Sequence, residues 1–232
     1  MFVTRNVRQL SGMTATGPWG ANVFLLLDKK LTLVDTGLKG RASRILKEIE
    51  NLGYSPSDIA NIILTHHHAD HVGSLAELKK ATGARIMAHP SDAPYIEGRL
   101  PQPGPARPKW LGKVLAPFNG MWASLPVGVD SLLNDGDVLP ILSGTKVLHT
   151  PGHTPGSISL LIPQEKLVIV GDLLRNTLRL SLPIGLFTVD IGQEINSVKK
   201  LASLDFDIVC FGHGKPLMHE ARKAVASFAN KL

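Results

Sequence analysis

The chain has 232 residues, 44% of them hydrophobic and 19% charged, which suits one large globular domain with a substantial core and argues against a disordered protein. Met1 to Met13 has no apolar stretch, and nowhere do about 18 apolar residues follow one another, so we expect neither a secretory signal nor a membrane-spanning helix. We therefore predict a cytoplasmic location. The lone cysteine, Cys210, excludes an internal disulfide and is expected to be a small buried side chain.

The net charge of +6 raises nucleic acid as a partner. The lysines and arginines are spread along the sequence, however, so most of them should be solvated, and we expect no nucleic acid to bind. One segment departs from this pattern, because residues 98–129 hold cations but no acid: Arg99, Arg107, Lys109 and Lys113.

Short apolar runs alternate with amphipathic stretches along the chain, which predicts an α/β fold of two packed sheets covered outside by helices. Strands are expected at Val23–Leu27, Leu31–Val34, Ile62–Leu64, Lys146–Leu148, Ile158–Ile162, Leu167–Val170 and Ile208–Phe211. Helices are expected near 40–52, 72–82, 192–203 and 217–231. In the first of these, Ile45, Leu46, Ile49 and Leu52 recur at helical spacing.

The segment Thr65–His71 follows the apolar run Ile62–Leu64 directly and contains four histidines and one aspartate. Three of the imidazoles and the carboxylate form the pattern His-x-His-x-Asp-His. Alternate side chains of an extended segment share a face, so His66 and His68 can point into one coordination sphere. Asp70 and His71 then turn toward a second position. The segment therefore predicts a metal site at the end of a buried strand.

Three more ligand-type residues stand where apolar strands give way to glycine-containing turns. They are His153 in Thr-Pro-Gly-His-Thr-Pro-Gly, Asp172 after Leu-Val-Ile-Val-Gly, and His213 after Ile-Val-Cys-Phe-Gly. Buried strands supply rigidity and the loops free side chains to bind, which makes these positions suitable for chemistry. For the remaining histidines we expect ordinary structural roles, with His67 close to the ligands: His67, His89, His149 and His219.

With these residues the chain resembles the metallo-β-lactamase superfamily over nearly its whole length. All five metal motifs of that family occur in order: Asp35 in Leu-Val-Asp-Thr-Gly, then the His66–His71 block, His153, Asp172 and His213. The His-x-His-x-Asp-His block followed by Gly-His-Thr-Pro-Gly is the most specific part of the match. The resemblance implies an αββα sandwich.

By the same resemblance, His66, His68 and His153 would hold metal 1, and Asp70, His71 and His213 would hold metal 2. Asp172 would bridge the two ions together with a water-derived hydroxide, because two nearby divalent cations lower the pKa of a shared water. Zinc is the expected metal by ligand preference, and iron and manganese are compatible with a His/Asp site.

Such a site predicts hydrolysis, in which water adds to a polarised carbonyl of a thioester, lactone or other ester. Asp70 is placed to orient the nucleophile and to carry a proton to the leaving atom, so it is the predicted catalytic residue. Asp35 is expected to lie behind the ligands and to order their loops.

The substrate is less defined by the sequence. Glyoxalase II-like thioesterases of the superfamily add a C-terminal glutathione-binding region, whereas little chain follows His213. Many homoserine lactonases carry Tyr three residues after the bridging Asp, where this chain has Arg175. An inward Arg175 would bind a substrate carboxylate, and a solvated arginine is the alternative. We expect a small and anionic substrate.

The segment 90–128 is rich in Pro and Gly and breaks the strand-helix pattern, so we interpret 1–232 as a single domain with an insertion there. Trp110 and Trp122 lie in an apolar stretch of this insertion and are candidates to contact substrate as part of a lid. A homodimer contact and an element that touches a membrane are the alternatives for the same residues.

Two other functions fit parts of the sequence. A persulfide dioxygenase-like oxidoreductase would use a single iron, but the ligands of the second metal are all present here. A metal-dependent nuclease draws support from the net charge of +6, but no extended basic arm is found. A binuclear metal-dependent hydrolase is therefore the function that we predict.

Overall fold

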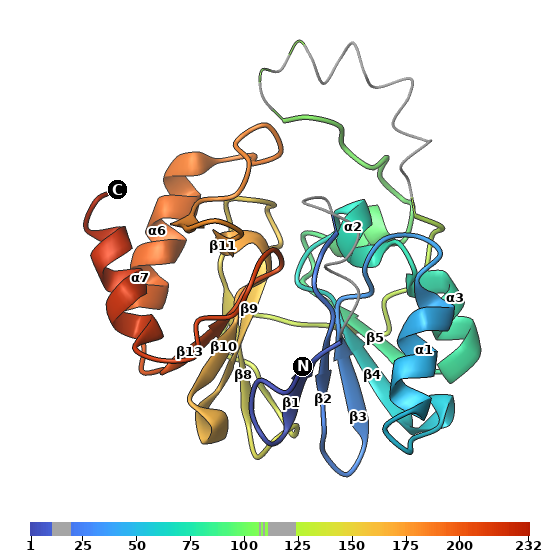
Figure 1. Cartoon of the computed structure of the whole chain (residues 1–232). Helices are drawn as coiled ribbons and strands as arrows, with labels where there is room; N and C mark the ends of the chain where they lie inside the picture. Colours follow the sequence, from blue (N-terminus) through green and yellow to red (C-terminus); the bar gives the residue numbers. More distant parts are fainter. Residues whose placement is uncertain (11–19, 107, 109, 111–123) are drawn as a thin grey trace.

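The computed structural model describes residues 1–10, 20–106, 108, 110 and 124–232. Two sheets face each other, and helices cover the outer side of each sheet (Figure 1). This arrangement confirms the predicted α/β fold with an αββα order of layers. No helix within the described residues is both long enough and apolar enough to cross a membrane.

The first sheet follows the chain, because its described strands lie side by side in the order of the sequence. β1, β2 and β3 pair antiparallel, and β3, β4, β5 and β6 pair parallel. The strands are β1 (Val7–Gln9), β2 (Phe24–Leu26), β3 (Leu31–Val34), β4 (Ile59–Ile63), β5 (Arg85–Ala88) and β6 (Ser131–Leu132).

The second sheet has the order β13-β10-β9-β8-β7 among the described residues. Only β10 and β13 are parallel there, and the other neighbours are antiparallel. Its strands are β7 (Val138–Leu139), β8 (Thr145–His149), β9 (Ile158–Ile162), β10 (Leu167–Ile169) and β13 (Ile208–Cys210). A separate small hairpin joins β11 (Arg175–Asn176) to β12 (Leu180–Ser181).

Helices α1 (Ala42–Glu50) and α3 (Leu75–Thr82) cover the first sheet, and α6 (Ile191–Ala202) and α7 (Ala221–Ala229) cover the second (Figure 1). Two single-turn helices, α2 (Ala69–Val72) and α4 (Ala93–Ile96), follow β4 and β5. The helix expected near 72–82 is α3, which begins three residues later, and α2 precedes it as a separate turn. They separate at Gly73, where a side chain would collide with the backbone of Leu38 and Lys39.

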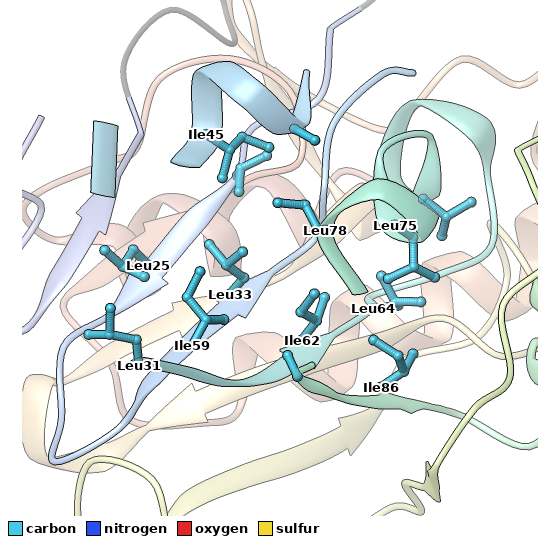
Figure 2. Close-up of a cluster of buried hydrophobic side chains, with 14 of the residues drawn as sticks. Leu25, Leu31, Leu33, Ile45, Ile59, Ile62, Leu64, Leu75, Leu78 and Ile86 are labelled. Atoms are coloured by element: carbon cyan, nitrogen blue, oxygen red, sulfur yellow. The ribbon is translucent and has the colours of Figure 1, made fainter. Parts of the chain in front are cut away.

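Three apolar clusters fill the spaces between the four layers. Leu33 and Ile62 point toward Ile45 and Leu78 of the helices (Figure 2), whereas the next residue on each strand, Val34 and Ile63, points toward the other sheet. Both faces of the sheets are therefore buried, which explains why the strands are continuous apolar runs. Each buried Leu or Ile contributes about 1.5–3 kcal/mol to folding.

The strand directions bring the ends of several strands to one edge of the sandwich. β3, β4 and β5 run parallel in the first sheet. β8, β10 and β13 share one direction in the second, because β9 is antiparallel to both β8 and β10. The segments that follow β4, β8, β10 and β13, including the short helix α2 after β4, contain all seven ligand-type residues found in the sequence.

Part of the segment 90–128 belongs to the described structure. Ala93 and Ile96 of α4 are buried in the core, and Ala106 N donates a hydrogen bond of 2.7 Å to Leu186 O in the loop before α6. Trp110 is 64% exposed. Residues 107, 109 and 111–123, which include Trp122, lie outside the described residues, so the lid interpretation stays a prediction.

A pair of stacked histidines joins the two sheets at the ends of β5 and β8. The ring of His89 lies 4.0 Å from that of His149 with an angle of 11° between them. His149 Nε2 lies 2.9 Å from Pro155 O, and Ser91 N donates to His89 Nδ1 over 3.2 Å. Burial and the neighbouring His149 lower the pKa of His89, although Asp92 and Asp135 act in the opposite direction.

This pair generates a prediction on stability. The pKa of His89 is lower in the folded than in the unfolded chain, so its contribution to stability is present above about pH 6.5 and is lost as the pH falls. In chelator-treated protein, His89→Gln should lower the free energy of unfolding more at pH 7.5 than at pH 5, measured by urea titration. The exposed His219→Gln controls for the loss of one imidazole. If His89→Gln lowers the free energy of unfolding by the same amount at both pH values, the prediction is contradicted.

Candidate metal centre

His66 and His68 lie in the extended loop that continues β4. The loop is anchored by Thr65, whose backbone N and Oγ1 both donate hydrogen bonds of 2.8 Å to Asp35. His66 is 1% exposed, and its Nε2 has no hydrogen-bond partner among the described residues. An imidazole nitrogen buried without a partner is costly, and a metal ion would satisfy it.

Helix α2 begins directly after this loop and turns the next two ligand-type side chains toward a second position. His68 has extended backbone angles, φ −64° and ψ 147°, and precedes the helix as its cap. His71 N and Val72 N donate to His68 O, over 2.9 Å and 3.0 Å. The switch from extended chain to helical turn therefore divides the His-x-His-x-Asp-His block into two pairs, as expected from its spacing.

The other residues come from the loops after β8, β10 and β13. The structure gathers all seven into overlapping groups, within each of which one ligand atom from each residue lies within 4.8 Å of the others. One group is His66, His68 and His153, and another is Asp70, His71 and His213. These groups match the two triads that the family resemblance implied.

Asp172 lies between the two triads. Its Oδ1 is 3.3 Å from His71 Nε2, while its Oδ2 is 3.5 Å from His153 Nε2 and 3.3 Å from His213 Nε2. The two carboxylate oxygens therefore face imidazoles of both triads. A carboxylate in this position has the geometry to bridge two cations, each held by one triad.

Asp35 supports the centre from behind. In addition to Thr65, its Oδ2 lies 2.8 Å from His71 Nδ1, which leaves His71 Nε2 to face the site. Asp35 has a φ of 63°, a left-handed conformation that costs free energy for a residue other than glycine. Hydrogen bonds to a backbone amide, a hydroxyl and an imidazole compensate for that cost. These contacts agree with the expected role of Asp35 in ordering the ligand loops.

The electrostatics of the two triads differ. Burial lowers the pKa of His66 and His68, and it lowers the pKa of His153 to about 4. These three histidines are therefore neutral, the form in which imidazole binds a metal. In the second triad, burial opposes the charge on His213, but Asp172 and Asp70 outweigh it and raise its pKa to about 10.

Two buried acids near the centre were not found in the sequence. Asp92 accepts hydrogen bonds from residues of both histidine loops, and Glu194 forms a hydrogen bond with Thr188, whose Oγ1 lies 3.2 Å from His153 Nδ1. Asp92 directly precedes α4, and Glu194 lies in the first turn of α6. Exposed acids are common at both kinds of position, and nothing in the sequence distinguishes a buried acid from an exposed one there.

Arg175, Trp110 and Trp122 were predicted to contact substrate. Arg175 is half-buried on β11, and the next residue, Asn176, donates from its backbone N to His213 O over 3.0 Å. Arg175 therefore lies beside the loop that carries a ligand-type histidine. Its role and that of Trp110 stay predictions, and Trp122 lies outside the described residues.

Comparison with known proteins agrees with this geometry. The sequence profile of the metallo-beta-lactamase superfamily matches residues 16–213, so the chain belongs to that superfamily. A probable metallo-hydrolase of Bacillus subtilis, YflN, is 30% identical, and the match covers 91% of this chain and 88% of that protein. The resemblance seen in the sequence is thereby confirmed.

Two further similarities describe the range of the family. The hydroxyacylglutathione hydrolase GloC of Haemophilus influenzae is 29% identical over 81% of this chain and 81% of its own length. A crystal structure of a metallo-beta-lactamase family protein from Thermus thermophilus superposes with a TM-score of 0.75 at 22% identity, covering 99% of this chain and 80% of that one. The structural likeness supports the fold.

The buried Glu194 generates a prediction. Burial raises its pKa to about 9, so the folded protein keeps a proton that the unfolded chain loses above about pH 4.5. The free energy of unfolding should therefore fall as the pH rises between these values. Glu194→Gln imitates the neutral acid, so it should gain stability relative to the wild type between pH 5 and pH 8.5 in urea titrations of chelator-treated protein. Glu77→Gln, on an exposed position of α3, is the control. If the stability of Glu194→Gln relative to the wild type does not rise with pH, Glu194 is ionised in the folded protein.

Proposed function

We propose that the protein is a binuclear metal-dependent hydrolase that attacks the carbonyl of a thioester, lactone or other ester. The observation that carries the proposal is the position of Asp172, whose two oxygens face imidazoles of two separate triads. A mononuclear oxidoreductase would need only the first triad. The second triad is complete here, which favours hydrolysis.

Two divalent cations bound by the triads would supply a nucleophile at neutral pH by lowering the pKa of a water, and would polarise the carbonyl. The chain itself then has to deliver and remove protons. Asp70 is suited to this role, because its side chain is 26% exposed whereas that of Asp172 is 9% exposed. Asp70 Oδ2 lies 3.1 Å from His213 Nε2, which holds the carboxylate beside the second triad.

A thioester is the first substrate class to test. GloC, named as a hydroxyacylglutathione hydrolase, supports this choice through its similarity along most of both chains. Thioesters also place the smallest demand on Asp70, because a thiolate leaves without being protonated first.

The metal prediction follows from the central position of Asp172. Wild-type protein should bind about two zinc ions per chain and hydrolyse at least one member of a panel of thioesters, lactones and esters. Asp172→Ala should lose both ions and the activity together, because Asp172 is the one residue expected to bind both ions. Elemental analysis measures the metal content, and the substrate panel measures the activity. Asp135→Asn is the control, because this carboxylate contacts His149 N and Lys200 Nζ and no ligand-type residue. Two ions retained by Asp172→Ala would refute the bridging role of Asp172. Activity only with a phosphodiester, or only with a persulfide and oxygen, would refute hydrolysis of a carbonyl substrate.

Arg175 supports an anionic acyl group as substrate. It is half-buried beside the His213 loop, and its guanidinium forms no hydrogen bond or ion pair with the described residues. A partly buried guanidinium is available to pair with a carboxylate, and such charge-assisted hydrogen bonds contribute about 1.5–3 kcal/mol.

A matched pair of substrates, one with a carboxylate on the acyl group and one without, tests this role. Arg175→Ala should lower kcat/KM for the charged substrate by about ten- to a hundredfold and leave the neutral one nearly unchanged. Arg179→Ala, in the turn of the same hairpin, controls for a general loss of positive charge. Equal losses for both substrates would mean that Arg175 supports the structure instead of binding the carboxylate.

A further inference from the structure

Asp92 stands directly before α4, in a position where an acid ordinarily caps a helix. Its side chain forms no capping hydrogen bond with α4. It is instead 1% exposed and points to the two loops that carry the histidines of the first triad. A buried carboxylate is costly unless several donors satisfy it, so these contacts need an explanation.

The first loop contacts Asp92 through His67, the residue between His66 and His68. His67 N donates a hydrogen bond of 2.9 Å to Asp92 Oδ2, and His67 Nδ1 lies 2.9 Å from the same oxygen. The other side of the His67 ring stacks on Tyr95, with 4.4 Å between ring centres and an angle of 19°. His67 is thus fixed, and the flanking histidines are fixed with it.

The second loop contacts Asp92 directly after His153. Thr154 Oγ1 donates to Oδ2 over 2.8 Å, and Gly156 N donates to Oδ1 over 2.7 Å. A β-carbon on Gly156 would lie 2.5 Å from Oδ1, so only glycine permits this approach. This close approach explains why the last residue of Gly-His-Thr-Pro-Gly is a glycine. Burial opposes ionisation of Asp92, but the contacts with His67, Thr154 and Gly156 lower its pKa.

We propose that Asp92 is the positioning residue of the first triad. One carboxylate sets the distance between the loop of His66 and His68 and the loop of His153. The second triad has its own support in Asp35, which contacts His71 directly. Loss of Asp92 should then weaken metal binding by the first triad selectively. The inference rests on the proposed function in one respect, namely that the triads bind metal ions.

The test isolates each triad in turn. His213→Ala weakens the second triad and leaves the first intact, and His153→Ala does the reverse. Asp92→Asn is added to each background, and zinc affinity is measured by competition with a chromogenic chelator. Asp92→Asn replaces one of the two accepting carboxylate oxygens by an NH2 group, which donates hydrogen bonds and cannot accept them. We expect Kd to rise about ten- to a hundredfold in the His213→Ala background and the cobalt(II) absorption spectrum to change there. In the His153→Ala background, Kd should change by no more than about twofold.

Two further variants keep the result unambiguous. Asp130→Asn is the matched control, because Asp130 accepts hydrogen bonds from Ile86 N over 2.7 Å and Lys79 Nζ over 2.8 Å, away from the ligand loops. It should leave both affinities within about twofold. Thr154→Val removes one donor to Asp92 and decides the question if Asp92→Asn does not fold. It should raise Kd by up to about tenfold in the His213→Ala background only.

The outcomes separate the inference from the proposed function. If the wild type binds two zinc ions, the role of Asp92 would be overturned by either of two results. Asp92→Asn could weaken zinc binding equally in both backgrounds, or it could weaken zinc binding in neither. A wild-type protein that binds no zinc would refute the proposed function, and the inference would fall with it.

Discussion

The charge on Asp172 is the constraint around which the two sheets are arranged. A carboxylate buried at the end of β10 is unstable without cations or donors nearby, and the structure supplies His71 from the first sheet and His153 and His213 from the second. Burial opposes its ionisation, but His213 and His71 hold its pKa well below the ordinary value. The carboxylate is therefore surrounded by imidazoles from both sheets, and the loops that carry them meet at one edge of the sandwich.

Much of the fold could be predicted, because sheets covered on both faces leave a strong apolar pattern. Leu31–Val34 and Ile158–Ile162 were found with the bounds that the structure has. β5 was missed because it begins with the exposed Arg85 and its apolar run is short, although its remaining residues are buried. β6 and β7 have two residues each, and no pattern of alternation can be recognised over that length.

The ligand-type residues could be predicted because histidines and aspartates repeat at fixed spacing after apolar strands. The residues that support them could not. Asp92 and His67 are distant in sequence and become neighbours only when α4 folds against the ligand loop. Glu194 could not be recognised either, because its position in the first turn of α6 is typical of a solvated acid. In the structure it is buried where α6 packs closely against Gly152. Such contacts depend on tertiary structure, which a single sequence does not specify locally.

The parallel arrangement of the strand ends has a practical consequence for handling the molecule. Since the ligand loops occupy one edge, the turns between β2 and β3 and between β9 and β10 are left at the other (Figure 1). Lys29 and Lys30 in the first turn, and Pro163 and Gln164 in the second, are exposed. Exposed turn tips tolerate inserted sequence better than buried ones. A fluorophore, an affinity tag or a surface tether attached at either turn would leave the carboxylates and imidazoles of the opposite edge undisturbed.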